Sequence, residues 1–166
     1  MRLFRLFNVV LATISSLLIS CAQQTVMQHE HQAMQSDSAT MTHSMSSNAA
    51  LFEDKTNAPQ LESRHKHYRF RLYSQETPIP MKKIHSWVVH VEDLEGHAIE
   101  NAEIFVFGGM PMHKHGFSTK PVVKQYLGNG DYLVEGIKFT MQGHWQIRFN
   151  IKHQAKRDRV VFDIHL

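Results

Sequence analysis

A strict alternation of apolar and polar residues close to the end of the chain limits what the protein can fold into. Four apolar residues alternate there with four polar ones, in the order Trp145, Gln146, Ile147, Arg148, Phe149, Asn150, Ile151 and Lys152. Because successive side chains of a β-strand point to opposite faces, this pattern predicts a strand with one buried face. That face must be covered by other parts of the chain.

The same period of two recurs from about Arg64 to Leu166, broken at short intervals by turn residues such as Gly128-Asn129-Gly130. The pattern predicts an all-β domain with antiparallel strands in two layers. About a hundred residues of this kind are enough for one sandwich with a single core. The seven expected strands cover about residues 66–74, 81–92, 98–107, 118–127, 130–139, 143–152 and 158–166.

The preceding part of the chain has a different composition. From Ala22 to about Asn57 it is rich in Gln, Ser, Thr, Met and His and has few large apolar residues. Such a segment cannot bury enough apolar surface to offset the entropy lost on ordering. We therefore expect a disordered tether over residues 21–60 and a folded domain over residues 61–166.

Residues 1–20 have the order of a secretory signal peptide. Arg2 and Arg5 precede an apolar stretch from Val9 to Ile19, and Cys21 follows directly after the leader. An apolar run of about a dozen residues is shorter than the roughly twenty that a membrane-spanning helix needs. Export is therefore favoured over a permanent span.

The segment Leu18-Ile19-Ser20-Cys21 resembles the lipobox of bacterial lipoproteins, which implies lipidation of Cys21. Cys21 is the only cysteine of the chain, so no disulfide forms within it. Attachment through two or more acyl chains is durable. The alternative is an ordinary signal peptide cut near Ala22 that leaves a free thiol.

Charge excludes one class of partner. Loss of Arg2 and Arg5 from eighteen basic residues leaves sixteen against fifteen acidic ones, so the processed chain is close to neutral. A strong basic field for nucleic acid is absent, and no nucleic-acid partner is expected. The expected location is the bacterial cell envelope, facing the periplasm, with the membrane as a partner through the lipid. Ala22 stands where an aspartate often retains lipoproteins in the inner membrane, which favours the outer membrane.

Histidine and methionine are unusually frequent, with thirteen and nine copies in 166 residues. Within the expected tether they form two groups, which are either incidental to a polar linker or a loose capture site for soft metal ions such as Cu(I). The residues of these groups are Met27, His29, His31, Met34, Met41, His43 and Met45.

A second group interrupts the β pattern at Gly108–Gly116, where Pro111 and the glycines predict a loop. In an extended or turning chain, residues two apart can point the same way, so Met110 with Met112 and His113 with His115 can converge. Two thioethers and two imidazoles suit Cu(I), whereas zinc more often recruits cysteine or a carboxylate. The alternative is that these side chains pack against the end of the core.

At this point the sequence resembles the YtkA-like/FixH-like domain over most of residues 80–166. The resemblance rests on Met110-Pro111-Met112-His113-Lys114-His115-Gly116, on Pro121, on Gly130-Asp131-Tyr132, and on Phe139-Thr140-Met141-Gln142-Gly143-His144-Trp145. It implies an immunoglobulin-like antiparallel β-sandwich in envelope proteins, often associated with copper handling or respiratory-oxidase assembly.

Carried over by position, the resemblance adds Met141 and Trp145 to the loop residues, with Met141 as a further thioether. The typical motif is Met-Pro-x-His-x-His-Gly, and a second methionine, Met112, stands here at the variable position.

Two functions therefore compete. The first is a tethered protein that binds or delivers copper, with Cu(I) favoured, to a metal-handling or respiratory-assembly protein of the envelope. The second is a non-catalytic assembly module whose loop is only structural. No enzyme is expected, because the chain has no Gly-x-Ser-x-Gly elbow, no His-Glu-x-x-His pair and no phosphate-binding glycine loop.

Overall fold

The computed structural model describes residues 47–166. Its regular elements, in chain order, are η1 (Ala49–Phe52), β1 (Gln60–Glu62), β2 (Arg69–Ser74), β3 (His85–Glu92), β4 (Glu103–Met110), η2 (Pro111–His113), β5 (His115–Gly116), β6 (Val122–Gly128), β7 (Asp131–Ile137), β8 (His144–His153) and β9 (Lys156–His165). No helix within these residues is long and apolar enough to cross a membrane.

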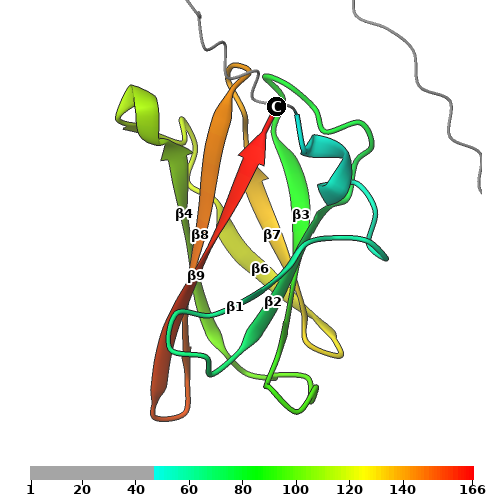
Figure 1. Ribbon diagram of the computed structural model, residues 1–166, viewed down its shortest axis with the longest axis vertical. Coiled ribbons are helices and arrows are strands. Elements are labelled where there is room, and N and C mark those ends of the chain that lie inside the picture. The colour runs from blue at the N-terminus through cyan, green and yellow to red at the C-terminus, as the bar shows by residue number, and fades with distance from the viewer. Residues whose placement is uncertain (1–46) are drawn as a thin grey trace, which may run out of the picture. The chain divides into compact units, whose positions relative to one another are not determined.

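The strands form the expected antiparallel immunoglobulin-like sandwich (Figure 1). One sheet has the order β1-β2-β3-β7-β6, and the other has the order β5-β4-β8-β9. All seven expected long strands are present, with ends displaced by a few residues. The two short strands β1 and β5 were not expected, since three and two residues are too few to show a period of two.

The alternation seen in the sequence is the alternation of burial in the structure. Along β8 the residues Trp145, Ile147, Phe149 and Ile151 are buried, and the intervening polar residues face outwards. The register pairs β8 with β9, so that Phe149 lies opposite Val160 and Ile147 opposite Phe162. Both sheets turn their apolar faces inwards onto one core, whose largest members are Trp87, Trp145, Tyr68, Phe52, Phe70, Phe139, Phe149 and Phe162.

The structure corrects the predicted boundary between tether and domain. Phe52 is only 2% exposed, and its ring lies 5.9 Å from that of Trp87 and 6.3 Å from that of Phe162. Burial of one phenylalanine side chain is worth about 1.5–3 kcal/mol. The sequence prediction missed this contact because a single phenylalanine in a polar stretch shows no periodicity.

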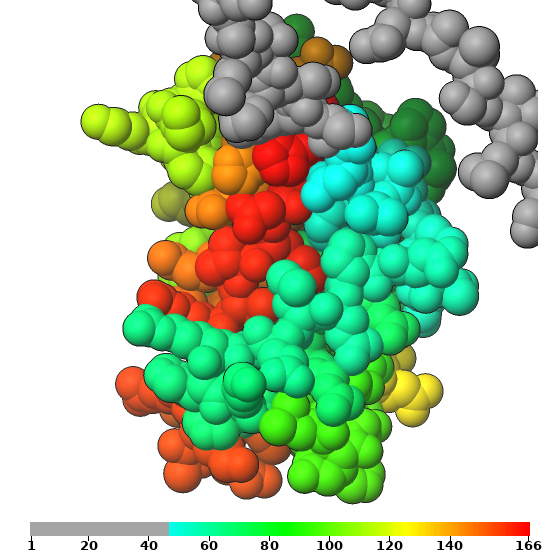
Figure 2. Space-filling view, viewed as in Figure 1, coloured from blue at the N-terminus to red at the C-terminus, as the bar shows by residue number. Residues whose placement is uncertain are grey.

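The residues before η1 are also attached to the domain. Asn48 bonds along the edge of β9: its side-chain amide donates to the Asp163 carbonyl, and its Oδ1 accepts from the backbone N–H of His165. Figure 2 shows this N-terminal segment in cyan against β9 in red. The folded unit therefore begins well before residue 61, and only the part of the tether before Ser47 lies outside the described residues.

Candidate functional site

The Met/His segment lies at one end of the sandwich, at the upper left of Figure 1. β4 runs further than expected, to Met110, and η2 then makes the reversal with Lys114 in the left-handed region at φ 54°. β5 returns beside β4, pairing Gly116 with Gly109 and His115 with Met110. We call residues Pro111–Gly116 the tip. The pairing of β5 with β4 makes the tip part of a short hairpin rather than an open loop.

The glycines of this segment have a different role from the one expected. Gly108 and Gly109 belong to β4 and do not make the reversal. A Cβ atom on Gly109 would collide with the His115 carbonyl, and one on Gly108 would collide with the Phe117 ring and the Gln146 carbonyl. These two positions therefore allow β5 and Phe117 to lie close against β4.

The two methionines of the tip region point into different surroundings. Met110 is 2% exposed and belongs to the core, and its Cε lies directly beneath Gly143. Met112 is 77% exposed. The structure thus separates a packed thioether from a free one, and it does not bring Met110 to the surface with the rest of the predicted set.

Both histidines of the tip are exposed and lie together. The ring centroids of His113 and His115 are 5.8 Å apart, and the rings are tilted by 36°. Nδ1 of His115 lies 3.2 Å from the Gly116 carbonyl oxygen. Because a carbonyl only accepts hydrogen bonds, Nδ1 carries the proton, and Nε2 keeps the lone pair that a metal ion requires.

Aromatic residues support this end from below. The His115 ring lies 6.2 Å from the Trp145 ring, which stacks on Phe117 at 5.6 Å and 14°. The Trp145 Nε1–H donates to the Met141 carbonyl at 3.0 Å. Met141, itself 42% exposed, therefore lies at the same end as the tip, as expected.

Cys21 and the histidines and methionines of the predicted tether lie outside the described residues. These are Met27, His29, His31, Met34, Met41, His43 and Met45.

A polar cluster that the sequence prediction missed surrounds Asp158 at the opposite end. The Asp158 carboxylate is fully buried and accepts hydrogen bonds from the Ser63 hydroxyl at 2.6 Å and from the backbone N–H groups of His65, His67 and Arg159. Burial raises the pKa of Asp158, but these hydrogen bonds outweigh it and hold the pKa below the usual 3.8. We call these five residues the Asp158 node.

The rings of the two node histidines also face the Asp158 carboxylate. Nδ1 of His65 and Nδ1 of His67 lie 3.2 and 3.3 Å from the two Asp158 oxygens. The sequence did carry a signal, since Asp158 occupies an inward position of the alternation that continues through Val160 and Phe162. A carboxylate at such a position requires buried donors.

One trio of potential ligands, Asp93, Glu95 and His97, places its ligand atoms within 4.8 Å of one another. The trio lies in the turn after β3. Asp93 Oδ1 accepts from the backbone N–H groups of Glu95 and His97, and Oδ2 lies 3.0 Å from Nδ1 of His97. Turn formation accounts for this arrangement.

Two hollows lie on the outer face of the β5-β4-β8-β9 sheet. One, of about 340 Å³, borders the tip at Pro111, Lys114 and His115. A larger one, of about 580 Å³, lies towards the Asp158 end between Phe105 and Arg64. Neither was anticipated from the sequence.

The fold and this end of the sandwich define an immunoglobulin-like domain that exposes a Met-Pro-Met-His-Lys-His tip. The family model described as YtkA-like matches residues 62–150, and the chain belongs to the YtkA-like family. This confirms the resemblance seen in the motifs. Searches of the curated proteins and of the solved structures found no match.

Proposed function

We propose that this chain is a lipid-anchored protein of the bacterial envelope that binds or delivers copper through its tip. The observation that carries the proposal is the free Nε2 of His115, held in place by the Gly116 carbonyl beside the exposed His113 ring. Metal-binding histidines characteristically have the other ring nitrogen fixed in this way.

The donor set of the tip suits Cu(I). Met112 contributes an exposed thioether beside the two imidazoles, and Met141 offers a second thioether at the same end of the sandwich. The tip contains no carboxylate and no cysteine, which zinc commonly recruits. Soft ligands in low number favour Cu(I) over Zn(II).

Met110 has a supporting role in this proposal. Its side chain fills the space between the tip and the turn at Gly143, so it fixes the position of the tip from inside the core. Replacing it is expected to change stability before it changes the donor set.

The test is Cu(I) retention by the full chain against a moderate chelator. Replacement of Met112, His113 and His115 by alanine should remove the tightest-bound ion, whereas His97→Ala, an exposed histidine outside the tip, should not. A chain in which all seven tether residues are replaced by serine should still hold copper at the tip. Equal retention by the triple variant and the unaltered chain would refute the tip as the site.

An assembly role is the second candidate, and the edge of β4 favours it. β4 pairs with β5 only at Gly109 and Met110, so most of its edge has no β5 neighbour. Edges of this kind can add a strand from another protein. Crosslinking in intact cells to one defined partner, undiminished in the triple tip variant, would support assembly over copper transfer.

A further inference from the structure

The outer face of the β5-β4-β8-β9 sheet carries side chains in ordered rows. The register places Glu103, Lys152 and Arg157 side by side across β4, β8 and β9. The next rows are Phe105, Asn150 and Arg159, and then Phe107, Arg148 and Val161. With Arg64, which joins β9 by a backbone bond to Arg159, these residues form what we call the arginine face.

The positive charges of this face exceed the carboxylates available to pair with them on the same face. Lys152 is paired with Glu103 at 2.9 Å, and Asp158 is buried in its node. Asp163, in the row beyond Arg148 and Val161, bonds to His144 and Gln146. Among the described residues, no carboxylate lies within 4.0 Å of the guanidinium groups of the face, which belong to Arg64, Arg148, Arg157 and Arg159. Four uncompensated cations thus lie together on a domain whose processed chain is close to neutral.

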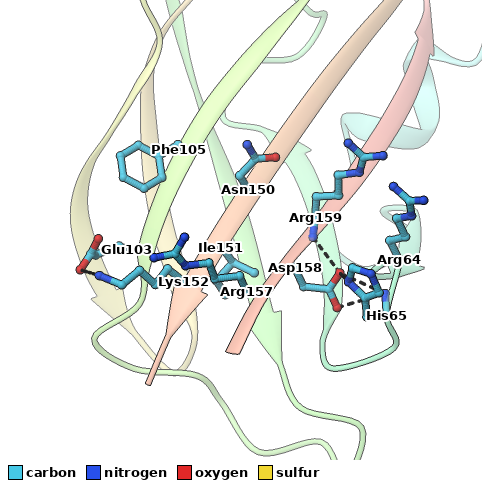
Figure 3. A pocket seen from close by; sticks show the side chains of 10 residues that line it. All are labelled: Arg64, His65, Glu103, Phe105, Asn150, Ile151, Lys152, Arg157, Asp158 and Arg159. Carbon is cyan, nitrogen blue, oxygen red and sulfur yellow. Dashed lines mark hydrogen bonds and ion pairs between the residues drawn. The ribbon is translucent and has the colours of Figure 1, made fainter. Parts of the chain in front are cut away.

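The face is hollowed where the arginines gather (Figure 3). The hollow of about 580 Å³ has Phe105 on one side and Arg64 with Arg159 on the other, and Asn150 lies between them. This volume falls within the range of about 300–1,000 Å³ typical of sites that hold a defined ligand.

Two exposed aromatic residues adjoin the charges. Phe105 is 53% and Phe107 45% exposed, and the Arg148 guanidinium lies 4.9 Å from the centre of the Phe107 ring. Exposed aromatic residues interleaved with arginine are characteristic of protein interfaces, where both types are enriched.

We propose that the arginine face docks an acidic, extended segment of a partner protein. Guanidinium groups bind carboxylates in pairs of parallel hydrogen bonds, and apolar residues between the carboxylates would cover Phe105 and Phe107. A hollow admits side chains of a peptide, whereas a flat bilayer surface cannot enter it. The smaller hollow continues past Phe107 and Arg148 to the tip, so the docked partner lies next to the tip, yet docking needs no metal.

The test uses the full chain in phosphatidylcholine vesicles and a labelled peptide of alternating glutamate and leucine, followed by fluorescence anisotropy. Replacement of Arg64, Arg157 and Arg159 by glutamine should weaken binding at least about tenfold, or about 1.4 kcal/mol, since it removes the charge-assisted hydrogen bonds to the glutamates of the peptide. All three side chains are exposed, so the fold should be retained.

The matched control replaces Lys82, Lys120 and Lys124, exposed lysines outside this face, by glutamine. It should change binding by less than about twofold. The triple tip variant should bind the peptide like the unaltered chain, which separates this proposal from copper binding. Equal weakening by the arginine and lysine sets, or no binding at all, would overturn it. So would displacement of the peptide by soluble short-chain phosphatidylglycerol while the chain stays in phosphatidylcholine vesicles, because the lipid headgroup would then occupy the face.

Discussion

The Asp158 node and the tip are both rich in polar and histidine side chains, and they differ in where their hydrogen bonds go. At the node, a buried carboxylate accepts hydrogen bonds from a hydroxyl and from three backbone N–H groups. At the tip, Met112, His113 and His115 face solvent, and the ring of His115 donates a hydrogen bond only to the carbonyl of its neighbour Gly116.

The difference separates two uses of the same residue types. At the node, His65 and His67 hold the turn in place through their backbone N–H groups, which donate to the buried Asp158 carboxylate. At the tip, the Gly116 carbonyl fixes Nδ1 of the His115 ring, and Nε2 is available. Residue identity alone therefore does not distinguish the two regions, whereas their hydrogen-bond partners do.

The largest effect is expected at the node. Asp158→Ala leaves the Ser63 hydroxyl and three backbone N–H groups without their acceptor in a buried place, at a cost of about 3–5 kcal/mol. Urea denaturation measures it. The exposed Asp163→Ala should cost less than about 1 kcal/mol.

Asp158 also makes the free energy of unfolding depend on pH in the acid range. Because its pKa is lowered in the folded state, its contribution is complete above about pH 3.8 and is lost as the pH falls through the folded-state value. The Asp158→Ala variant should lack this part of the acid dependence. If the stability of the variant fell with acid as steeply as that of the unaltered chain, the description of the node would be wrong.

The two methionines provide a sharper contrast at the tip end. Met110→Ala should cost about 2–5 kcal/mol, because it removes a core side chain that is 2% exposed. Met112→Ala should cost less than about 0.5 kcal/mol, because Met112 is 77% exposed. Under conditions in which both variants are folded, Met112→Ala should lose more copper than Met110→Ala. Similar stability losses would show that the tip packs more tightly than its exposure indicates.

His85 is intermediate between the two regions and has the smallest expected effect. It is 3% exposed, its Nδ1–H donates to the Lys83 carbonyl, and burial lowers its pKa despite this bond and the nearby Glu76 charge. The unfolded chain therefore binds a proton at higher pH than the folded one. Stability from His85 is complete above about pH 6.5 and declines as the pH falls towards the folded-state pKa.

Urea midpoints at about pH 7.5 and pH 5.5 measure this decline. His85→Gln should reduce the difference between the two midpoints, and the exposed His97→Gln should leave it unchanged. An identical decline in all three proteins would assign it to other groups.

The sheets could be predicted from the sequence because burial on one face imposes a period of two. Residues such as Ile147 and Phe162 lie inwards as their spacing requires. The same rule could not find β5 or the attachment of Phe52, which depend on contacts between distant parts of the chain. Phe52 reaches Trp87 and Phe162 only after the strands have assembled.

The sequence predicted where the candidate site lies, but not which of its side chains are exposed and which are buried. The motif placed Met112, His113, His115 and Met141 at one end, and the structure brings them there. Met110 in fact continues the inward phase of Ile104 and Val106 along β4. The prediction missed this because Pro111 and the glycines indicate a loop, which would end the alternation before Met110. The sequence also did not reveal the arginine face, since its residues come from β4, β8, β9 and the turn before β2.

Leu166 pairs with Gly143 through reciprocal backbone hydrogen bonds of 2.9 and 3.1 Å, and Gly143 lies between Met141 and His144. Any extension of the chain past Leu166 therefore starts beside the tip. A polyhistidine purification tag placed there would compete for the same ions and crowd the same surface.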